Sequence, residues 1–245
     1  MSELFAELDY RITPIGALSL RRRRELSSGA DIFEIKLGDE YLMSSQFTVS
    51  EIALARLGLA VLQGGQLDVV VGGLGLGFTA RAVLENENVK SLMVIELLDA
   101  VIDWNVTGLL PLGTTLASDS RSRIVQGDFF ALAKGRSGFD KAEPGRRFDA
   151  ILLDIDHSPE ALLDGRSTSF YQPDGLRALS AHLKPGGVFG LWSNDKPDPA
   201  FTERLAGVFA EAWAEPVTFY NRLQDRPSTQ TVYLARATRS PLEAA

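Results

Sequence analysis

Four glycines crowded into six residues constrain this chain more than any other feature. The apolar run at residues 67–71 is typical of a buried strand, and the run at residues 79–84 is typical of a helix. The glycines between them are Gly72, Gly73, Gly75 and Gly77. Glycine adopts backbone angles that other residues avoid and lets a ligand approach the main chain, while the next helix offers free N–H groups. The sequence therefore predicts a strand, a nucleotide-binding turn and a helix.

Strand-like and helix-like runs continue to alternate along the chain. Further strands are expected at residues 91–95, 123–125, 148–154 and 187–192, with helices between them such as 98–106 and 174–183. Alternation of this kind predicts a mostly parallel sheet with helices on both faces. After a helix expected at residues 201–213, residues 217–221 and 229–235 are predicted to pair as an antiparallel hairpin. The fold class is therefore α/β, with a Rossmann-like sheet of seven strands.

The N-terminal part of the chain has a different period. Residues 17–20 and 31–37 alternate apolar and polar side chains, which is the mark of half-buried strands. We therefore expect a small antiparallel β-meander over residues 1–47. The nucleoside-binding domain is assigned to residues 48–245, and its residues 239–245 are expected to form a frayed tail.

Two short features lie in or beside the meander. The basic run Arg21–Arg24 is interpreted as a solvated strand end in preference to an anion or partner contact. Thr48 precedes a helical pattern, and Glu51 three residues later gives the spacing of a capping box. We expect both to serve local structure.

Composition excludes several classes of protein. The 245 residues contain no cysteine and two histidines, so a disulfide scaffold, a cysteine nucleophile and a metal centre are not expected. The formal charge of −7 argues against general nucleic-acid binding, which needs clustered basic residues. No apolar run approaches the length of about 20 residues that a membrane span needs. The N-terminus lacks the basic start of a signal peptide, so we expect a soluble, cytoplasmic protein with no membrane or nucleic-acid partner.

Acidic residues follow the second and third strands of the expected sheet. Glu96 closes the strand at residues 91–95, where a carboxylate can accept both ribose hydroxyls of an adenosine group. Asp128 follows the next strand and can bind the adenine amino group, with Phe129 offering its ring to the base. Asp128 also suits the N-cap of a helix that begins at Phe129, and the two interpretations are equally open.

A third acidic cluster follows the strand at residues 148–154. Asp154, Asp156 and His157 reach the carboxyl edge of the sheet, where ligands bind in open α/β folds. Two acids and a histidine at this edge can handle protons at a substrate amine or hydroxyl, so they are our candidate catalytic residues. A structural role for His157 is the alternative. His182 is interpreted as a helix C-terminal residue that complements the helix dipole.

These elements, in this order, resemble the class I S-adenosylmethionine-dependent methyltransferase fold over about residues 48–237. More narrowly, the N-terminal meander and the glutamate-bearing helix resemble the spermidine synthase family. The resemblance implies a sulfonium donor, either S-adenosylmethionine or its decarboxylated form, and no metal. It also implies a small-molecule acceptor and a homodimer. The implied donor contacts are the four glycines, Glu96, Asp128, Phe129 and Asp154, and the implied substrate contacts are Gln46, Glu51 and Tyr171.

The sequence departs from the spermidine synthase pattern on the amine side. Gly75 stands where the family usually has an aspartate, and Val49 stands where a tyrosine is usual. After the fourth strand the family usually shows D-S-S-D-P, and His157 occupies the place of the second acid. On these grounds we favour methyl transfer, with polyamine aminopropyl transfer as the alternative.

Two other classes of protein stay open. One is a nucleoside-binding module without catalysis. The other is a nicotinamide-dependent oxidoreductase, because Gly75, Gly77 and Ala80 satisfy the dinucleotide pattern G-x-G-x-x-G/A.

Overall fold

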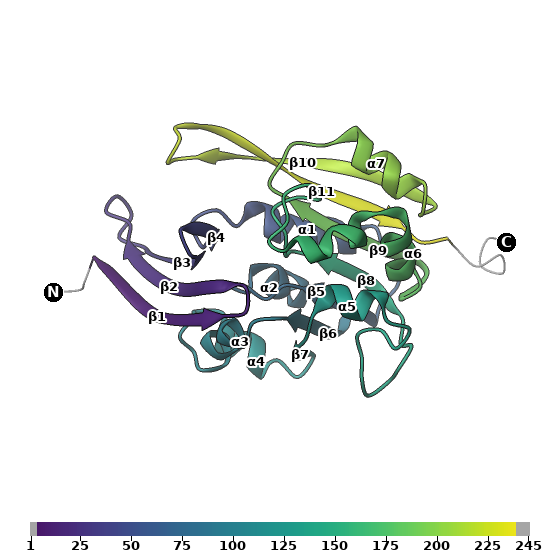
Figure 1. Ribbon diagram of the computed structural model, residues 1–245, viewed down its shortest axis with the longest axis horizontal. Coiled ribbons are helices and arrows are strands. Elements are labelled where there is room, and N and C mark those ends of the chain that lie inside the picture. Colours follow the sequence, from purple (N-terminus) through teal and green to yellow (C-terminus); the bar gives the residue numbers. More distant parts are fainter. Residues whose placement is uncertain (1–3, 239–245) are drawn as a thin grey trace.

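The N-terminal part of the chain forms a separate antiparallel sheet. The computed structural model of the protein describes residues 4–238, and the expected tail at 239–245 lies outside them. The first sheet has the strand order β1-β2-β3-β4, and its strands are β1 (Phe5–Thr13), β2 (Gly16–Arg24), β3 (Asp31–Leu37) and β4 (Glu40–Ser44). It lies beside the larger sheet, at the left of Figure 1. The expected meander is therefore present, and it begins with a strand that the sequence pattern did not indicate.

The second sheet has seven strands in the order β10-β11-β9-β8-β5-β6-β7. Its strands are β5 (Leu67–Gly72), β6 (Val89–Glu96), β7 (Ser122–Gln126), β8 (Phe148–Leu153), β9 (Leu183–Ser193), β10 (Glu211–Asn221) and β11 (Arg226–Arg236). Strands β5 to β9 pair in parallel, whereas β11 pairs antiparallel with both β9 and β10. The predicted α/β class, the seven-stranded sheet and the C-terminal hairpin are confirmed.

Helices cover both faces of this sheet (Figure 1). They are α1 (Val49–Ala60), α2 (Phe78–Leu84), α3 (Asp99–Val106), α4 (Gly113–Ser118), α5 (Phe129–Lys134), α6 (Pro173–Ser180), α7 (Pro199–Ala206) and a 3-10 helix (Gly165–Tyr171). Successive residues of the central strand β5 point to opposite faces, so Val69 and Val71 belong to one apolar cluster and Val70 to the other. All three valines are fully buried, which explains why β5 is a continuous apolar run.

The helix expected at residues 201–213 is shorter than predicted. Helix α7 ends at Ala206, and β10 begins at Glu211, so Trp213 lies in a strand opposite Leu234. The run of apolar residues is compatible with either structure, and pairing with β11 selects the strand. The predicted capping box is also wrong: Thr48 is the N-cap of α1, but its side chain makes no capping hydrogen bond.

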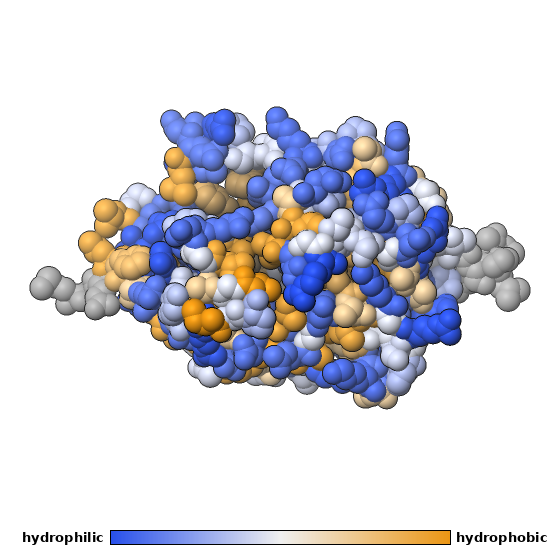
Figure 2. Space-filling view, viewed as in Figure 1, coloured by the Kyte–Doolittle hydropathy of each residue, from blue (hydrophilic) through white to orange (hydrophobic). Residues whose placement is uncertain are grey.

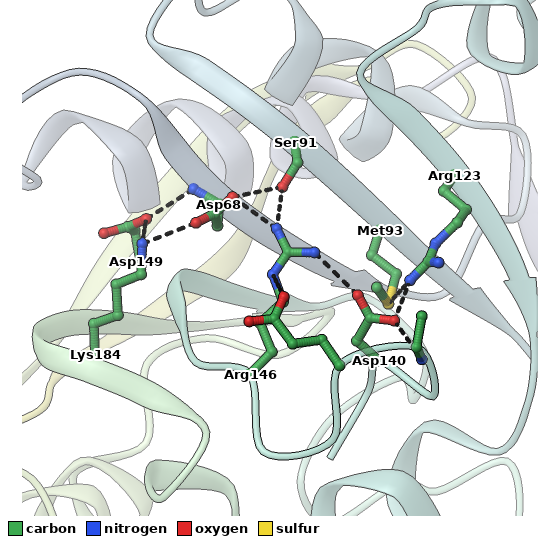
Figure 3. Close-up of polar contacts among 10 residues, drawn as sticks. Asp68, Ser91, Met93, Arg123, Asp140, Arg146, Asp149 and Lys184 are labelled. Carbon is green, nitrogen blue, oxygen red and sulfur yellow. Dashed lines mark hydrogen bonds and ion pairs between the residues drawn. The ribbon is translucent and has the colours of Figure 1, made fainter. Parts of the chain in front are cut away.

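A network of charged residues ties together the amino ends of the parallel strands (Figure 3). Asp68 of β5 accepts hydrogen bonds from Ser91 Oγ at 2.7 Å, Arg146 at 2.8 Å and Lys184 Nζ at 2.9 Å. Lys184 also reaches Asp149 of β8 at 2.7 Å. The network therefore joins β5, β6, β8 and β9 at the edge opposite the predicted site.

Candidate functional site

A cavity of about 350 Å³ opens at the carboxyl edge of the sheet. Its wall comes from the segments that follow β5, β6, β7 and β8, together with α1 and the N-terminal sheet. On the face drawn in Figure 2, apolar residues gather near the centre, with hydrophilic residues around them. The cavity is thus where the sequence places the ligand site, and the N-terminal sheet completes it.

The glycine turn contributes to the cavity through two of its four glycines. Gly73 and Gly75 line it, and both have positive φ, of 95° and 47°. A Cβ at Gly73 would lie 2.1 Å from the carbonyl oxygen of Asp154, so only glycine lets these segments come so close. The close approach brings the turn and the end of β8 together in one wall.

The other two predicted glycines serve packing. Gly72 and Gly77 are not among the residues that line the cavity. A Cβ at Gly72 would lie 2.5 Å from the ring of Phe129, and one at Gly77 would lie 2.6 Å from Leu116. Gly77 is also the N-cap of α2, with a left-handed backbone. Glycine at these two positions therefore lets Phe129 and Leu116 pack closely against the turn.

Glu96 lies in the cavity wall at the end of β6, as the sequence predicts. Its carboxylate accepts hydrogen bonds from the N–H groups of Leu74 and Leu98, each at 2.9 Å. Burial raises the pKa of this carboxyl group, and the backbone N–H groups oppose the rise. Glu96 therefore connects the glycine turn with the start of α3.

Asp128 and Phe129 both line the cavity at the start of α5. Asp128 caps the helix by accepting the N–H of Ala131 at 3.1 Å, so the capping interpretation is confirmed and a ligand contact is compatible with it. Phe129 is only 2% exposed and packs on Phe139 with ring centroids 5.0 Å apart. Its neighbour Phe130 also lines the cavity and is less deeply buried.

Asp154 and Glu51 form a pair of acids in the cavity wall. Thr79 Oγ1 donates to Asp154 at 2.6 Å, and Ser50 Oγ donates to Glu51 at 2.9 Å. Burial, together with the nearby Asp154, raises the pKa of Glu51, and burial also raises that of Asp154 against the hydrogen bond from Thr79. Within residues 4–238 neither carboxyl group forms an ion pair with a basic side chain. The pair therefore keeps a proton at pH values well above those at which carboxyl groups ordinarily lose it.

Asp156 faces its own segment of chain. It accepts hydrogen bonds from the Tyr171 hydroxyl at 2.7 Å, the N–H of Leu163 at 2.8 Å and Ser167 Oγ at 3.3 Å. Burial raises its pKa, and the hydrogen bond from Tyr171 opposes the rise. Tyr171 itself is 1% exposed and is not among the cavity-lining residues. Asp156 thus holds the segment that follows β8, and Tyr171 supports it from the core.

His157 lies in the cavity wall, between the main sheet and the N-terminal sheet. Its Nε2 atom is 3.1 Å from Oε1 of Glu40 in β4, and its side chain is 24% exposed. Its carbonyl oxygen accepts the N–H of Asn194 at 2.7 Å. The structure brings His157 to the predicted site, and its catalytic role stays a prediction.

Gln46 lies outside the cavity wall. Its side-chain oxygen accepts a hydrogen bond from Arg23, and Arg23 also pairs with Glu34 at 2.8 Å. Glu34 and Arg23 come from neighbouring strands of the N-terminal sheet. Gln46 therefore belongs to the ion-pair network of the basic run, and the predicted substrate contact is not part of this wall.

Sequence reasoning missed several residues of the site, among them Thr79, Met43 and Trp192. Thr79 is the second residue after Gly77, in the first turn of α2, and a hydroxyl at that position was the available signal. Met43 Sδ accepts the N–H of Leu76 at 3.0 Å, and Trp192 lines the cavity at the end of β9. Both Met43 and Trp192 look like ordinary apolar residues in their strands, so only the tertiary structure reveals them.

Two general observations concern metal ions and membranes. Residues 4–238 contain no cluster of three or more His, Cys, Asp or Glu side chains arranged to hold a metal ion. None of their helices is long and apolar enough to cross a membrane.

Curated relatives of this chain are polyamine aminopropyltransferases. The protein from Mycobacterium tuberculosis is 32% identical over 132 residues, which cover 53% of this chain and 23% of that protein. The protein from Aeropyrum pernix is 27% identical, over 53% of this chain and 38% of that protein. The protein from Pseudomonas aeruginosa is 25% identical, over 59% of this chain and 40% of that protein. The chain therefore spans between about a quarter and two fifths of the length of these relatives. No protein-family profile matches it.

Solved structures agree on the fold. A spermidine synthase in complex with the transition-state analogue AdoDATO superposes with a TM-score of 0.71 and 18% identity, over 97% of this chain and 75% of that one. Spermidine synthase from Thermotoga maritima superposes with a TM-score of 0.70 and 18% identity, over 97% of this chain and 74% of that one. The chain therefore has the fold of these spermidine synthases, and about half of it is similar in sequence to polyamine aminopropyltransferases.

Proposed function

We propose that this protein transfers an aminopropyl group from decarboxylated S-adenosylmethionine to an amine. The observation that carries the proposal is the pair of carboxyl groups beside the glycine turn, buried Glu51 and half-buried Asp154, without a basic partner in the described chain. Two acids in a desolvated wall favour a cationic ligand, and both the sulfonium donor and an ammonium acceptor are cations. The relatives named above support aminopropyl transfer over the methyl transfer that the sequence departures favoured.

The nucleoside end of the donor suits the wall made by the glycine turn and the ends of β6 and β7. Gly73 and Gly75 line this wall, Glu96 can accept from ribose hydroxyls, and Asp128 can accept from the adenine amino group. A sulfonium supplies an already activated carbon. The protein then has to hold the amine and that carbon in line.

The amine must lose a proton before it attacks. We assign this proton to the Asp154–Glu51 pair, because a carboxyl group whose pKa is raised toward neutrality is an effective base there. The amine nitrogen forms a bond to the propyl carbon, the carbon–sulfur bond breaks, and methylthioadenosine leaves with the electron pair on sulfur. Thr79 holds Asp154 in place through its 2.6 Å hydrogen bond.

The test is to incubate the protein with decarboxylated S-adenosylmethionine and a panel of amines, and to measure methylthioadenosine. We expect product with the wild-type chain and a loss of about 100-fold or more in kcat for Asp154→Asn. Thr79→Val is the matched variant: it keeps Asp154 and removes the hydroxyl that contacts Asp154 at 2.6 Å and the Glu51 carbonyl oxygen at 3.3 Å, so a smaller loss is expected. Methylation of the amine with S-adenosylmethionine, without methylthioadenosine formation, would show that the donor assignment is wrong.

A further inference from the structure

The part of the cavity wall that the N-terminal sheet supplies is entirely apolar. Its four residues are Ile15, Ile35, Leu42 and Met43. Ile35 is 1% exposed and belongs to the central apolar cluster, against which the other three pack. This sheet therefore brings no charged or polar side chain to the wall of the cavity.

Met43 fixes this apolar wall against the glycine turn. Its sulfur accepts the N–H of Leu76 at 3.0 Å. A Cβ at Gly75 would lie 2.2 Å from the same sulfur, so the turn and the wall are in close contact there. The space beside Gly75 is filled by a thioether, and that position offers no acid to a ligand.

Four of the six acids in the wall accept hydrogen bonds from main-chain N–H groups of neighbouring loops and helix starts. Glu96 accepts from Leu74 and Leu98, and Asp128 accepts from Ala131. The same is true of Asp156 and Asp164, whose partners are the N–H groups of Leu163 and Arg166. The other two acids, Glu51 and Asp154, accept from the hydroxyl groups of Ser50 and Thr79 and lie close enough to repel each other, so they make one locus for a cation on the acceptor side.

From this distribution we infer that the acceptor carries a single nitrogen on an apolar chain: it is a primary alkylamine and not a diamine. The inference rests on the proposed function. With its reacting nitrogen at Glu51 and Asp154, a diamine would place its second ammonium group against the apolar wall. A buried charge without a partner is unfavourable, whereas an alkyl chain gains from burial in the same place.

One further acid, Glu40, lies near the cavity through its contact with His157. Glu40 is 61% exposed, lies outside the lining residues and contacts His157 Nε2 at 3.1 Å. A diamine that extended to the rim would meet Glu40 in competition with His157. The experiment below therefore includes Glu40→Gln.

The experiment compares butylamine with butane-1,4-diamine, which differ only in the second nitrogen. Binding of each to the full chain saturated with methylthioadenosine is measured by titration calorimetry. We expect butylamine to bind about tenfold or more tighter than the diamine. Equal binding, tighter binding of the diamine, or no binding of either amine would overturn the inference.

A charge placed in the wall gives a second test. Leu42 is half-buried, so Leu42→Glu can place a carboxylate there, and Leu42→Gln is the matched control of similar shape. We expect Leu42→Glu to shift the ratio of the two affinities toward the diamine by about tenfold, and Leu42→Gln to leave it in favour of butylamine. An unchanged ratio in Leu42→Glu, or a diamine affinity that falls in Glu40→Gln, would contradict the inference.

The proposed function is judged by a different readout. Methylthioadenosine release with decarboxylated S-adenosylmethionine tests group transfer, while calorimetry tests the preference for one nitrogen. Turnover of the diamine in preference to butylamine would overturn the inference and leave aminopropyl transfer intact. A butylamine preference in binding without any turnover would support the inference and reject the transfer.

Discussion

Glu51 and Asp154 show how the surroundings of a residue set its chemistry. Both are ordinary acids in the sequence, and their side chains meet only because α1 lies beside the end of β8 in the folded chain. Burial makes each carboxylate costly, and the proximity of two such groups adds repulsion. The site therefore stores a proton near the proposed acceptor, at some expense to stability.

Because ionised Glu51 is destabilised by burial and by Asp154, we expect Glu51→Gln to have a pH-dependent effect on stability. The folded-state pKa of Glu51 lies above its unfolded value, so the folded state binds the extra proton and wild-type stability falls as pH rises above about 4.3. Glutamine has no such dependence. Urea unfolding should show the variant gaining roughly 1–3 kcal/mol on wild type between pH 4 and pH 8. A difference that is constant with pH would contradict the raised pKa.

Glu96→Ala should affect both ligand binding and folding. The substitution removes the proposed ribose contact and leaves the N–H groups of Leu74 and Leu98 without their acceptor. We expect methylthioadenosine affinity to fall about tenfold or more, and the free energy of unfolding to fall by about 1–3 kcal/mol. Calorimetry and urea unfolding measure the two effects. Unchanged affinity would remove Glu96 from the donor site.

His157→Ala should lower kcat clearly and leave methylthioadenosine affinity nearly unchanged. The reason is position, because His157 lies in the cavity wall, where its ring contacts Glu40 of β4. Glu40→Gln is the control, since it removes the charge that faces His157 and keeps the ring. An equal loss of kcat in both variants would indicate that the contact matters more than the imidazole.

The residues that sequence analysis identified are those fixed by their place after a strand. Glu96 and Asp154 each end an apolar run, and parallel strands present their carboxyl ends at one edge. Trp192 ends such a run too, but an indole at the end of an apolar strand carries no chemical signal. The pairing of Thr79 with Asp154 depends on how β5 and β8 lie side by side, and sequence spacing does not contain that information.

At the scale of elements, the charged network lies at the amino ends of the strands, and the site lies at their carboxyl ends. Burial alone would raise the pKa of Asp68, but hydrogen bonds from Ser91 and Lys184 and the charge of Lys184 lower it overall. Ion pairs with Arg123 and Arg146 likewise outweigh burial and lower the pKa of Asp140. The network thus stabilises the junction of four strands as long as its carboxylates stay ionised.

Acid should therefore weaken the fold through this network. The folded-state pKa values of Asp68 and Asp140 lie below their unfolded values, so their stabilisation is complete above about pH 4 and is lost as pH falls through the folded values. Asp68→Asn should cost about 1–3 kcal/mol at pH 7 and less at pH 3. Urea unfolding at the two pH values measures this, and a cost that does not shrink would exclude linkage through Asp68.

Element boundaries divide into those that local patterns determine and those that pairing determines. The strand–glycine–helix unit at residues 67–84 was predicted nearly to the residue, because buried strands and glycine turns leave strong local signals. Trp213 was placed in a helix, since the run from residue 201 contains apolar residues at intervals that suit either structure. Its partner Leu234 is distant in sequence, so the strand becomes evident only in the folded sheet.

For the whole molecule, the two sheets share one apolar core. Leu18, Leu20 and Ile35 of the N-terminal sheet belong to the same buried cluster as Leu54 of α1 and Val232 of β11. The division into residues 1–47 and 48–245 therefore describes sequence patterns and proposed roles. It does not imply that either part has a core of its own.

This shared core predicts a single cooperative unfolding transition. Far-ultraviolet circular dichroism and tryptophan fluorescence should give coincident urea curves, since loss of the N-terminal sheet exposes the core of the main sheet. Deletion of residues 1–47 should yield a chain that aggregates or lacks a cooperative transition. Two separate transitions, or a deletion variant that unfolds cooperatively, would show that the sheets are independent.

The position of β11 in the sheet has a consequence for the chain as it is made. Residues 226–236 are synthesised after all five parallel strands, yet they pair with β9 on one side and β10 on the other. Until they leave the ribosome, the nascent sheet presents β9 with an open edge, and such edges attract other chains. The sheet therefore reaches its final strand order only after residue 236 has emerged from the ribosome.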